Sequence, residues 1–147
     1  MPGLLAYSGG EPVGWISVAP RREFGRVLRS PNLKPVPDQP AGDVARAVWS
    51  IVCFWIPREQ RRRGVAAALL DAAVAYAADQ GAERVEAYPI DTRGARASSA
   101  EIFTGTLEMF QRAGFADVRR RADKRPVVQR ALRSPAPQPP APQLPVR

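Results

Sequence analysis

Apolar residues are densest in the segment AVWSIVCFWI, Ala47 to Ile56, in which Ser50 is the single polar residue. Apolar side chains stand at both the odd and the even positions, so both faces of an extended segment would be apolar. This pattern is typical of a central β-strand covered on two sides. Pro57 ends the segment. We predict that one face carries Val48, Val52, Phe54 and Ile56, and that the other carries Trp49, Ile51, Cys53 and Trp55.

The next apolar pattern has the helical period, with apolar residues three or four positions apart from Val65 onward. It predicts a helix from Gly64 or Val65 to about Gln80, with Gly81 as the C′ glycine. The segment from Arg84 to about Ile90 predicts a second strand. A strand, a helix and a strand at this spacing form a βαβ unit, in which the two strands run parallel.

The flanking segments predict antiparallel pairs. Two short apolar stretches surround the turn at 8–11, where two glycines supply positive φ, and they predict an N-terminal β-hairpin. The stretches FADVRRR and PVVQRAL predict a closing antiparallel hairpin. Residues 20–43, rich in proline, predict a connecting loop.

Residues 98–113 predict a second helix, because Ser98 and Glu101 fit a capping box. Gly105 marks a kink or a later start of this helix. The elements together predict an α/β fold: a mixed sheet with a central parallel βαβ unit, an N-terminal hairpin and a C-terminal antiparallel hairpin. We place the domain at residues 1–133 and interpret residues 134–147, SPAPQPPAPQLPVR, as a proline-rich disordered tail.

Composition narrows the function classes. The net charge of +8 favours an anionic partner without identifying it. The chain has no histidine and one cysteine, so we expect no metal site and no histidine base. A single cysteine excludes an internal disulfide, and no apolar run is long enough to span a bilayer. With no recognisable signal peptide, we expect a cytoplasmic protein without a membrane partner.

The stretch RRRGVA, Arg61 to Ala66, stands between the first predicted strand and its helix. A helix N-terminus has unpaired N–H groups and a partial positive charge, and therefore binds anions. Gly64 allows close approach of the backbone, and the arginines would offset the charge of a pyrophosphate. The dinucleotide fingerprint and the P-loop both need residues that this stretch lacks. A phosphate ligand is therefore favoured over the alternative, a solvated basic loop.

This stretch resembles the acetyl-coenzyme A motif of the GNAT N-acetyltransferase superfamily, Gln/Arg-x-x-Gly-x-Gly/Ala. The stretch MFQRAGF is similar to LYEKxGF of that family, and the resemblance extends to about Leu132. It implies a GNAT fold, acetyl-coenzyme A as co-substrate, and direct attack by a primary amine of a small molecule or protein. By position, it implies that the coenzyme contacts Phe54, Trp55, Ile56, Arg61, Arg62, Arg63, Gly64, Val65 and Ala66.

The chain departs from the family pattern at three points. Phe110 stands where the family often has a tyrosine that protonates the leaving thiolate, so either Tyr88, Thr106 or water serves as the donor, or the thiolate leaves unassisted. Phe103 stands where the family often has an asparagine. The family usually has a strand and helices before the first hairpin, so we interpret the chain as an N-terminally shortened member.

Glu86 and Tyr88 are the candidate catalytic residues. They lie two positions apart on the second predicted strand, and therefore on one side of it. In the absence of histidine, Glu86 is the candidate general base, directly or through a water. The alternative interpretation is a strand carboxylate paired with an arginine.

Two other functions stay open beside the N-acetyltransferase. Phe110 and the short N-terminus favour a non-catalytic coenzyme A-binding module. The net charge favours a nucleic-acid-binding protein, but we rank this third because the aromatic residues are not interleaved with the arginines. A homodimer also stays open.

Overall fold

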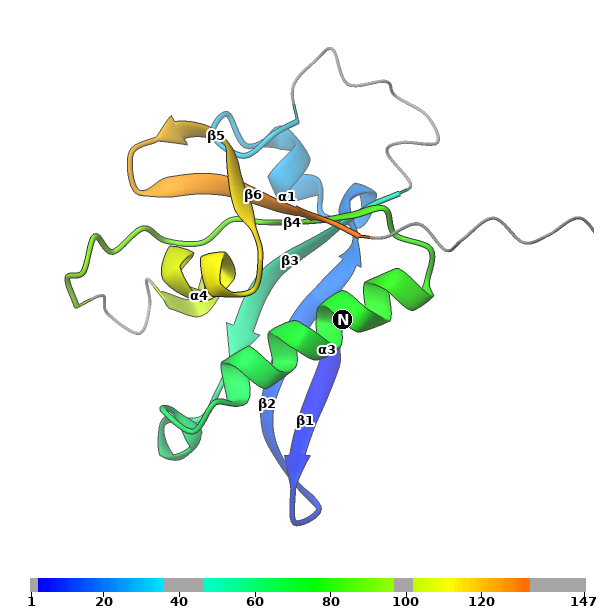
Figure 1. Ribbon diagram of the computed structural model, residues 1–147, viewed down its shortest axis with the longest axis vertical. Helices are drawn as coiled ribbons and strands as arrows, with labels where there is room; N and C mark the ends of the chain where they lie inside the picture. Colours follow the sequence, from blue (N-terminus) through cyan, green and yellow to red (C-terminus); the bar gives the residue numbers. More distant parts are fainter. Residues whose placement is uncertain (1–2, 36–46, 97–101, 133–147) are drawn as a thin grey trace, which may run out of the picture.

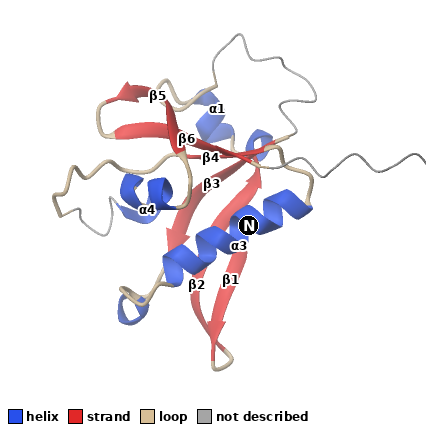
Figure 2. Cartoon of the chain, viewed as in Figure 1, coloured by secondary structure: helices blue, strands red, loops and turns tan. Residues whose placement is uncertain are grey.

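The computed structural model describes residues 3–35, 47–96 and 102–132 of the 147-residue chain. Its central feature is a mixed sheet with the strand order β1-β2-β3-β4-β6-β5, with α3 crossing one face (Figures 1 and 2). The predicted α/β fold with a mixed sheet is confirmed. The strands are β1 (Leu4–Ser8), β2 (Glu11–Pro20), β3 (Val48–Trp55), β4 (Arg84–Ala87), β5 (Ala116–Ala122) and β6 (Arg125–Ala131). The α-helices are α1 (Gly25–Arg29), α3 (Val65–Asp79) and α4 (Leu107–Arg112).

Both predicted hairpins are confirmed. β1 and β2 pair antiparallel around Gly9 and Gly10, whose φ angles of 57° and 83° favour glycine. β5 and β6 also pair antiparallel. The hairpins flank the central strands, so that β2 pairs antiparallel with β3 and β6 with β4.

The βαβ unit is also confirmed. β3 and β4 are parallel and are joined through α3. The helix follows Gly64 and ends before Gly81, whose φ of 87° suits the C′ position. β4 ends at Ala87, earlier than the predicted Ile90, which instead forms an isolated bridge to the segment before α4.

β3 carries a bulge at Val52, because Cys53 pairs with Ser17 of β2 and Ile51 pairs with the next residue of that strand. An extra residue shifts the alternation of side chains by one position. Phe54 therefore joins Ile51 in the core under α3, whereas Val52 packs against a different cluster. The predicted faces, which placed Phe54 with Val52, are wrong for this reason.

The predicted helix over residues 98–113 is wrong between residues 102 and 106. Its capping-box residues lie outside the described residues, and Ile102–Thr104 forms a 3₁₀ turn, η3. Gly105, with a φ of 83°, separates this turn from α4. The helix begins after Thr106, whose Oγ1 accepts a hydrogen bond from the Met109 N–H at 3.3 Å. The later start, one of the two options for Gly105, is the one observed.

Residues 21–29, predicted as part of a connecting loop, instead contain the 3₁₀ turn η1 (Arg21–Glu23) and the helix α1. Residues 36–46 of the predicted loop lie outside the described ranges. Val27 of α1 packs with Tyr88 and Val127 in a second cluster. Because Val128 belongs to the core under α3 and is adjacent to Val127 on β6, the two clusters cover opposite faces of the sheet.

The main core lies between α3, α4 and one face of the sheet. Its fully buried side chains include Ile16, Ile51, Leu70, Val85 and Phe110. The proposed tail at 134–147 lies outside the described residues, so its disorder and the boundary at 133 stay predictions.

Candidate functional site

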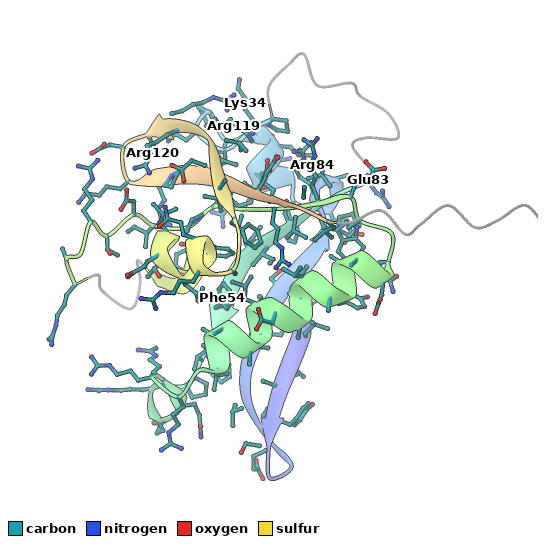
Figure 3. All side chains as sticks on the ribbon, in the orientation of Figure 1. Lys34, Phe54, Glu83, Arg84, Arg119 and Arg120 are labelled. Carbon is teal, nitrogen blue, oxygen red and sulfur yellow. The ribbon has the colours of Figure 1, made fainter. Side chains whose placement is uncertain are left out.

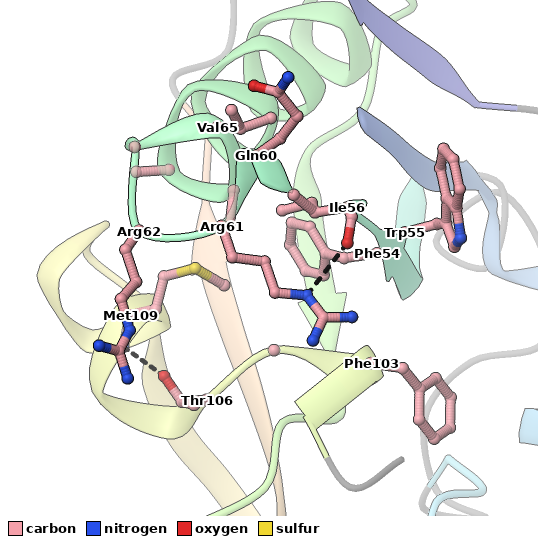
Figure 4. Close-up of a pocket in the computed structure, with 14 residues that line it drawn as sticks. Phe54, Trp55, Ile56, Gln60, Arg61, Arg62, Val65, Phe103, Thr106 and Met109 are labelled. Carbon is pink, nitrogen blue, oxygen red and sulfur yellow. Dashed lines mark hydrogen bonds between the residues drawn. The ribbon is translucent and has the colours of Figure 1, made fainter. Parts of the chain in front are cut away.

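A cavity of about 630 Å³ opens between the end of β3, the start of α3 and the segment before α4 (Figure 4). One end carries cationic and backbone groups from the β3–α3 connection, and the rest is mainly apolar. Its lining residues are Phe54, Trp55, Ile56, Gln60, Arg61, Arg62, Gly64, Val65, Ala66, Ala67, Phe103, Gly105, Thr106 and Met109.

The cavity exists because two parallel strands stop pairing before the first of them ends. The last β3–β4 pair is Ile51 with Ala87, while β3 continues to Trp55. The chain around η3 lies against this free stretch of β3. At Gly105, an added Cβ would lie 2.7 Å from Phe110 and 3.1 Å from Phe54, so close approach requires glycine here.

The connection between β3 and α3 has a backbone shape that suits an anion. Arg62 and Gly64 have φ angles of 61° and 78°, so left-handed residues alternate with right-handed or extended ones. Such alternation turns successive N–H groups toward one concave point, which binds anions. Gly64 is the N-cap of α3 and supplies no side-chain cap, so the dipole end of a 15-residue helix faces the same region.

Two arginines add charge to this end of the cavity. Arg61 donates from Nε to the Ile56 carbonyl oxygen at 3.1 Å, which leaves its guanidinium along the cavity wall (Figure 4). Arg62 also lines the cavity, whereas Arg63 is exposed and does not. The structure therefore brings together eight of the nine residues predicted to contact a coenzyme, all except Arg63.

Several lining residues were not predicted. Phe103, Gly105 and Met109 form the wall opposite α3, but the sequence pattern placed all three within the helix predicted over residues 98–113, with a kink or a later start at Gly105. The signal that could have found this wall is Gly105, because a glycine in a helical pattern can separate two shorter elements. Thr106, considered above as a proton donor, does line the cavity.

Glu86 and Tyr88 do not line this cavity. They face the same side of the sheet, as predicted, and Tyr88 donates from its hydroxyl to Glu86 Oε2 at 2.6 Å. The carboxylate is fully buried and has three further partners: Arg21 at 3.3 Å, Arg119 at 3.4 Å and Gln129 at 2.7 Å. The position matches the alternative interpretation, a strand carboxylate paired with arginines.

Tyr88 keeps its proton in this network. Burial raises the pKa of the Tyr88 hydroxyl well above its usual range, and the neighbouring Glu86 charge raises it further. The hydroxyl also shares a hydrogen bond of 2.8 Å with Ser50. A proton held this firmly, outside the cavity, does not suit a donor to a leaving group there.

The Glu86 network also fixes the segment between β2 and β3. Arg119 donates to the Leu33 carbonyl oxygen at 2.9 Å, and Arg121 donates to the Lys34 carbonyl oxygen at 2.6 Å. Arg119 and Lys34 lie close together at this end of the molecule (Figure 3). The arginines of β5 therefore hold residues 31–34 against the sheet.

Phe110 is fully buried under the cavity and packs edge-to-face with two other rings. The ring centroids lie 6.1 Å from Phe54 and 5.0 Å from Phe115. A phenylalanine cannot donate a proton, and this one supports the cavity wall through Phe54.

In the described part of the chain, no three His, Cys, Asp or Glu side chains gather to hold a metal ion. No helix of that part is long and apolar enough to cross a membrane.

The chain belongs to the acetyltransferase (GNAT) family, whose model matches residues 2–115. No curated protein sequence matches the chain. Among solved structures, the chain is similar to the GNAT domain of PAT from S. lividans, with 20% identity and a TM-score of 0.56 over 88% of this chain and 60% of that one.

Two other solved structures have the same fold. A GCN5-related N-acetyltransferase from Kribbella flavida is 19% identical, with a TM-score of 0.53 over 84% of this chain and 62% of that one. Ard1 from Thermoplasma volcanium is 16% identical, with a TM-score of 0.55 over 90% and 71% of the two chains. This chain thus spans less than two thirds of the S. lividans and Kribbella chains.

Proposed function

We propose that the protein transfers an acetyl group from acetyl-coenzyme A to a primary amine. One observation carries the proposal: a single cavity joins a cationic, anion-binding loop at a helix N-terminus to the free edge of β3. A ligand with phosphates at one end and an acyl thioester at the other matches these two ends. The cavity volume is within the range of about 300–1,000 Å³ that is usual for small-molecule sites.

The residues of the β3–α3 connection are assigned to the coenzyme's pyrophosphate. The N–H groups after Arg62 and in the first turn of α3 are assigned to its oxygens, and the guanidinium groups of Arg61 and Arg62 to balancing its charge. Arg63 acts, in this proposal, only through the field of its charge. The main chain of Phe54 to Ile56 is assigned to the pantetheine arm.

In the proposed reaction, the amine nitrogen forms a bond to the acetyl carbon while the carbon–sulfur bond breaks. The amine loses a proton to solvent, and the sulfur gains one. We assign a main-chain N–H of β3 beyond Ile51 to the acetyl oxygen, because pairing with β4 has ended there. Thr106 is assigned as the proton donor to sulfur and regains its proton from solvent; it lines the cavity, and its oxygen accepts from Met109, which leaves its O–H to donate.

Glu86 and Tyr88 have no part in this chemistry as proposed, because their hydrogen bonds hold them outside the cavity. The acceptor is a primary amine of a small molecule or a protein. We place the reaction in the cytoplasm, because a chain with one cysteine suits a reducing compartment.

One observation favours a second candidate, a coenzyme A-binding module without turnover. Phe110, buried where the family often has a tyrosine, removes a proton donor from the site. Binding of acetyl-coenzyme A with no thiol release for any amine would identify this alternative.

The test combines calorimetry with a thiol-release assay on the full chain. Acetyl-coenzyme A is expected to bind in the micromolar range, and S-acetylpantetheine, which lacks the pyrophosphate, is expected to bind at least tenfold more weakly. Thiol release with a panel of small amines and peptides then reports turnover. Equal affinity for the two thioesters would contradict the assignment of the arginine loop. Absence of binding, together with salt-sensitive binding of DNA or RNA, would favour the nucleic-acid alternative.

A further inference from the structure

The parallel strands β3 and β4 part at a defined point, here called the fork, after their last ladder pair, Ile51 with Ala87. Pro89, which is fully buried, has no N–H to continue the ladder. The Ile90 N–H then donates to the Gly105 carbonyl oxygen at 2.9 Å. The chain that follows β4 is therefore bound to the segment before α4, and β3 continues without it.

A buried chain of hydrogen bonds crosses from β3 to β4 beside the fork, on the face of the sheet opposite α3. Tyr88 is the first residue beyond the last ladder pair, and its hydroxyl donates to Glu86 Oε2 at 2.6 Å. Because this bond uses the Tyr88 proton, the Ser50 hydroxyl on β3 donates to the Tyr88 oxygen, at 2.8 Å. Ser50 and Glu86 form the ladder pair just before the last one, so Tyr88 joins their side chains across the two strands.

The Glu86 end of this chain is held firmly in place. The carboxylate is fully buried and has three further donors on neighbouring segments, Arg21, Arg119 and Gln129. Hydrogen bonds to an ionised group are about twice as strong as those between neutral groups. A hydroxyl bound to such a carboxylate has a fixed position, so Tyr88 fixes the side of β3 to which it is bonded.

The stretch of β3 just after the fork is the one assigned above to the acetyl oxygen. Its first residue, Val52, is the bulged residue of the strand. A bulge bends a strand, so the direction of the N–H groups that follow depends on how β3 leaves the ladder. Donors to a developing oxyanion have to lie within about 0.5 Å of their productive positions. The geometry of the fork therefore matters for the proposed chemistry.

From these observations we propose that Tyr88 is a positioning residue. Its bond to Ser50 fixes where β3 leaves β4, and this aims the free N–H groups of β3 at the acetyl oxygen. Tyr88 touches no reacting atom, since it does not line the cavity. The inference rests on the proposed function, but control of the fork by Tyr88 can be measured in the protein without a ligand.

The first test is amide hydrogen exchange, followed by NMR on the free full chain. Tyr88→Phe keeps the ring and removes the hydroxyl. We expect the protected amides of the last two β3–β4 pairs to exchange about tenfold faster or more, and those of α3 to exchange as in the wild type. The matched control is Tyr76→Phe, an exposed ring on α3, which is expected to exchange as the wild type does throughout. Unchanged exchange at the fork in Tyr88→Phe overturns the proposal. An equal increase at the fork and in α3 also overturns it, because the hydroxyl then supports only the global stability.

The second test separates chemistry from binding, with an amine that the wild type acetylates. Tyr88→Phe is expected to lower kcat about tenfold or more per binding-competent molecule, counted from the calorimetric stoichiometry of acetyl-coenzyme A. Its Kd for acetyl-coenzyme A is expected to stay within about twofold of the wild-type value, because Tyr88 lies outside the residues assigned to the coenzyme. Ser50→Ala breaks the same bond from the β3 side and is expected to have the same effect. The double variant is expected to lose no more than either single variant.

Three results of the second test overturn the positioning role. They are an unchanged kcat in Tyr88→Phe, equal losses of kcat and affinity, and additive losses in the double variant. A wild type without turnover for any amine contradicts the proposed function and the positioning role with it. The exchange experiment tells these failures apart, because it reports on the fork whether or not the protein is an enzyme.

Discussion

Arg62 combines a backbone and a charge requirement in one residue. Its φ of 61° is unusual for a residue with a side chain, while its guanidinium lines the cavity. Arg62→Gly allows the same left-handed backbone and removes the side chain together with its charge. We expect acetyl-coenzyme A to bind about tenfold more weakly, or about 1.4 kcal/mol. We expect the free energy of unfolding to change by less than about 0.5 kcal/mol.

Calorimetry and denaturant unfolding check this pair of values. Arg63→Ala is the matched control, because it removes the same charge from a neighbouring residue outside the cavity. An equal loss of affinity in both variants would show that only the overall field matters, and that Arg62 has no direct contact with the ligand.

A substitution at Glu86 can distinguish a structural role of this residue from a catalytic one. Its buried carboxylate balances the Arg21 and Arg119 guanidinium groups. Glu86→Gln keeps the shape and removes the charge, so it leaves these cations uncompensated. We expect the free energy of unfolding to fall by about 3–5 kcal/mol, the range for breaking a buried ion pair. Glu83 is exposed and lies three residues earlier in the chain. The free energy of unfolding of Glu83→Gln is expected to stay within about 0.5 kcal/mol of the wild-type value.

Denaturant unfolding measures this stability, and the pH profile of thiol release tests the chemistry. A Glu86→Gln variant that folds as stably as the wild type, yet loses the acidic arm of its pH profile, would restore Glu86 as the general base. The predicted result is a less stable protein whose folded fraction retains the wild-type profile.

At the scale of elements, the sequence predicted the regular parts and missed the irregular ones. Periodicity identified β3, α3 and the two hairpins, because each has a continuous pattern bounded by glycine or proline. The bulge at Val52 was invisible to a period of two, since one extra residue leaves the composition unchanged. The local motif therefore predicted the cationic end of the cavity, whereas the opposite wall depends on where Gly105 interrupts a helical pattern.

Gly105 is the residue that allows this wall to form. An added Cβ would lie 2.7 Å from Phe110, 2.8 Å from Met109 and 3.1 Å from Phe54, at a φ of +83°. We expect Gly105→Ala to lower the free energy of unfolding by about 2–4 kcal/mol, from overpacking and from backbone strain together. Gly94→Ala is the control, because Gly94 has a φ of +80° and open space, and it is expected to lose about 1 kcal/mol.

Denaturant unfolding of the two variants separates the two contributions. If both variants lose the same amount, the Phe54–Phe110 wall yields easily and the strain is confined to the backbone. A larger loss at Gly105, accompanied by weaker binding of acetyl-coenzyme A, would show that the packing of this wall sets the shape of the cavity.

At the scale of the whole molecule, charge is distributed unevenly around the sheet. Cations cluster at the β3–α3 connection, in residues 21–34 and on β5, while β1, β2 and α3 have none. Arg61 and Arg62 of the first cluster line the cavity, and the arginines of β5 fix residues 31–34, so the positive charge has local partners as well as a long-range field.

This distribution predicts different salt dependences for the two thioester ligands. Acetyl-coenzyme A is a polyanion bound by a chain with a net charge of +8, so screening weakens its binding. We expect its affinity to fall severalfold between low and high salt, measured by calorimetry. S-acetylpantetheine carries no phosphate, and its affinity is expected to be insensitive to salt. A parallel loss for both thioesters would assign the salt effect to the fold of the site, because an uncharged ligand has no charge to screen.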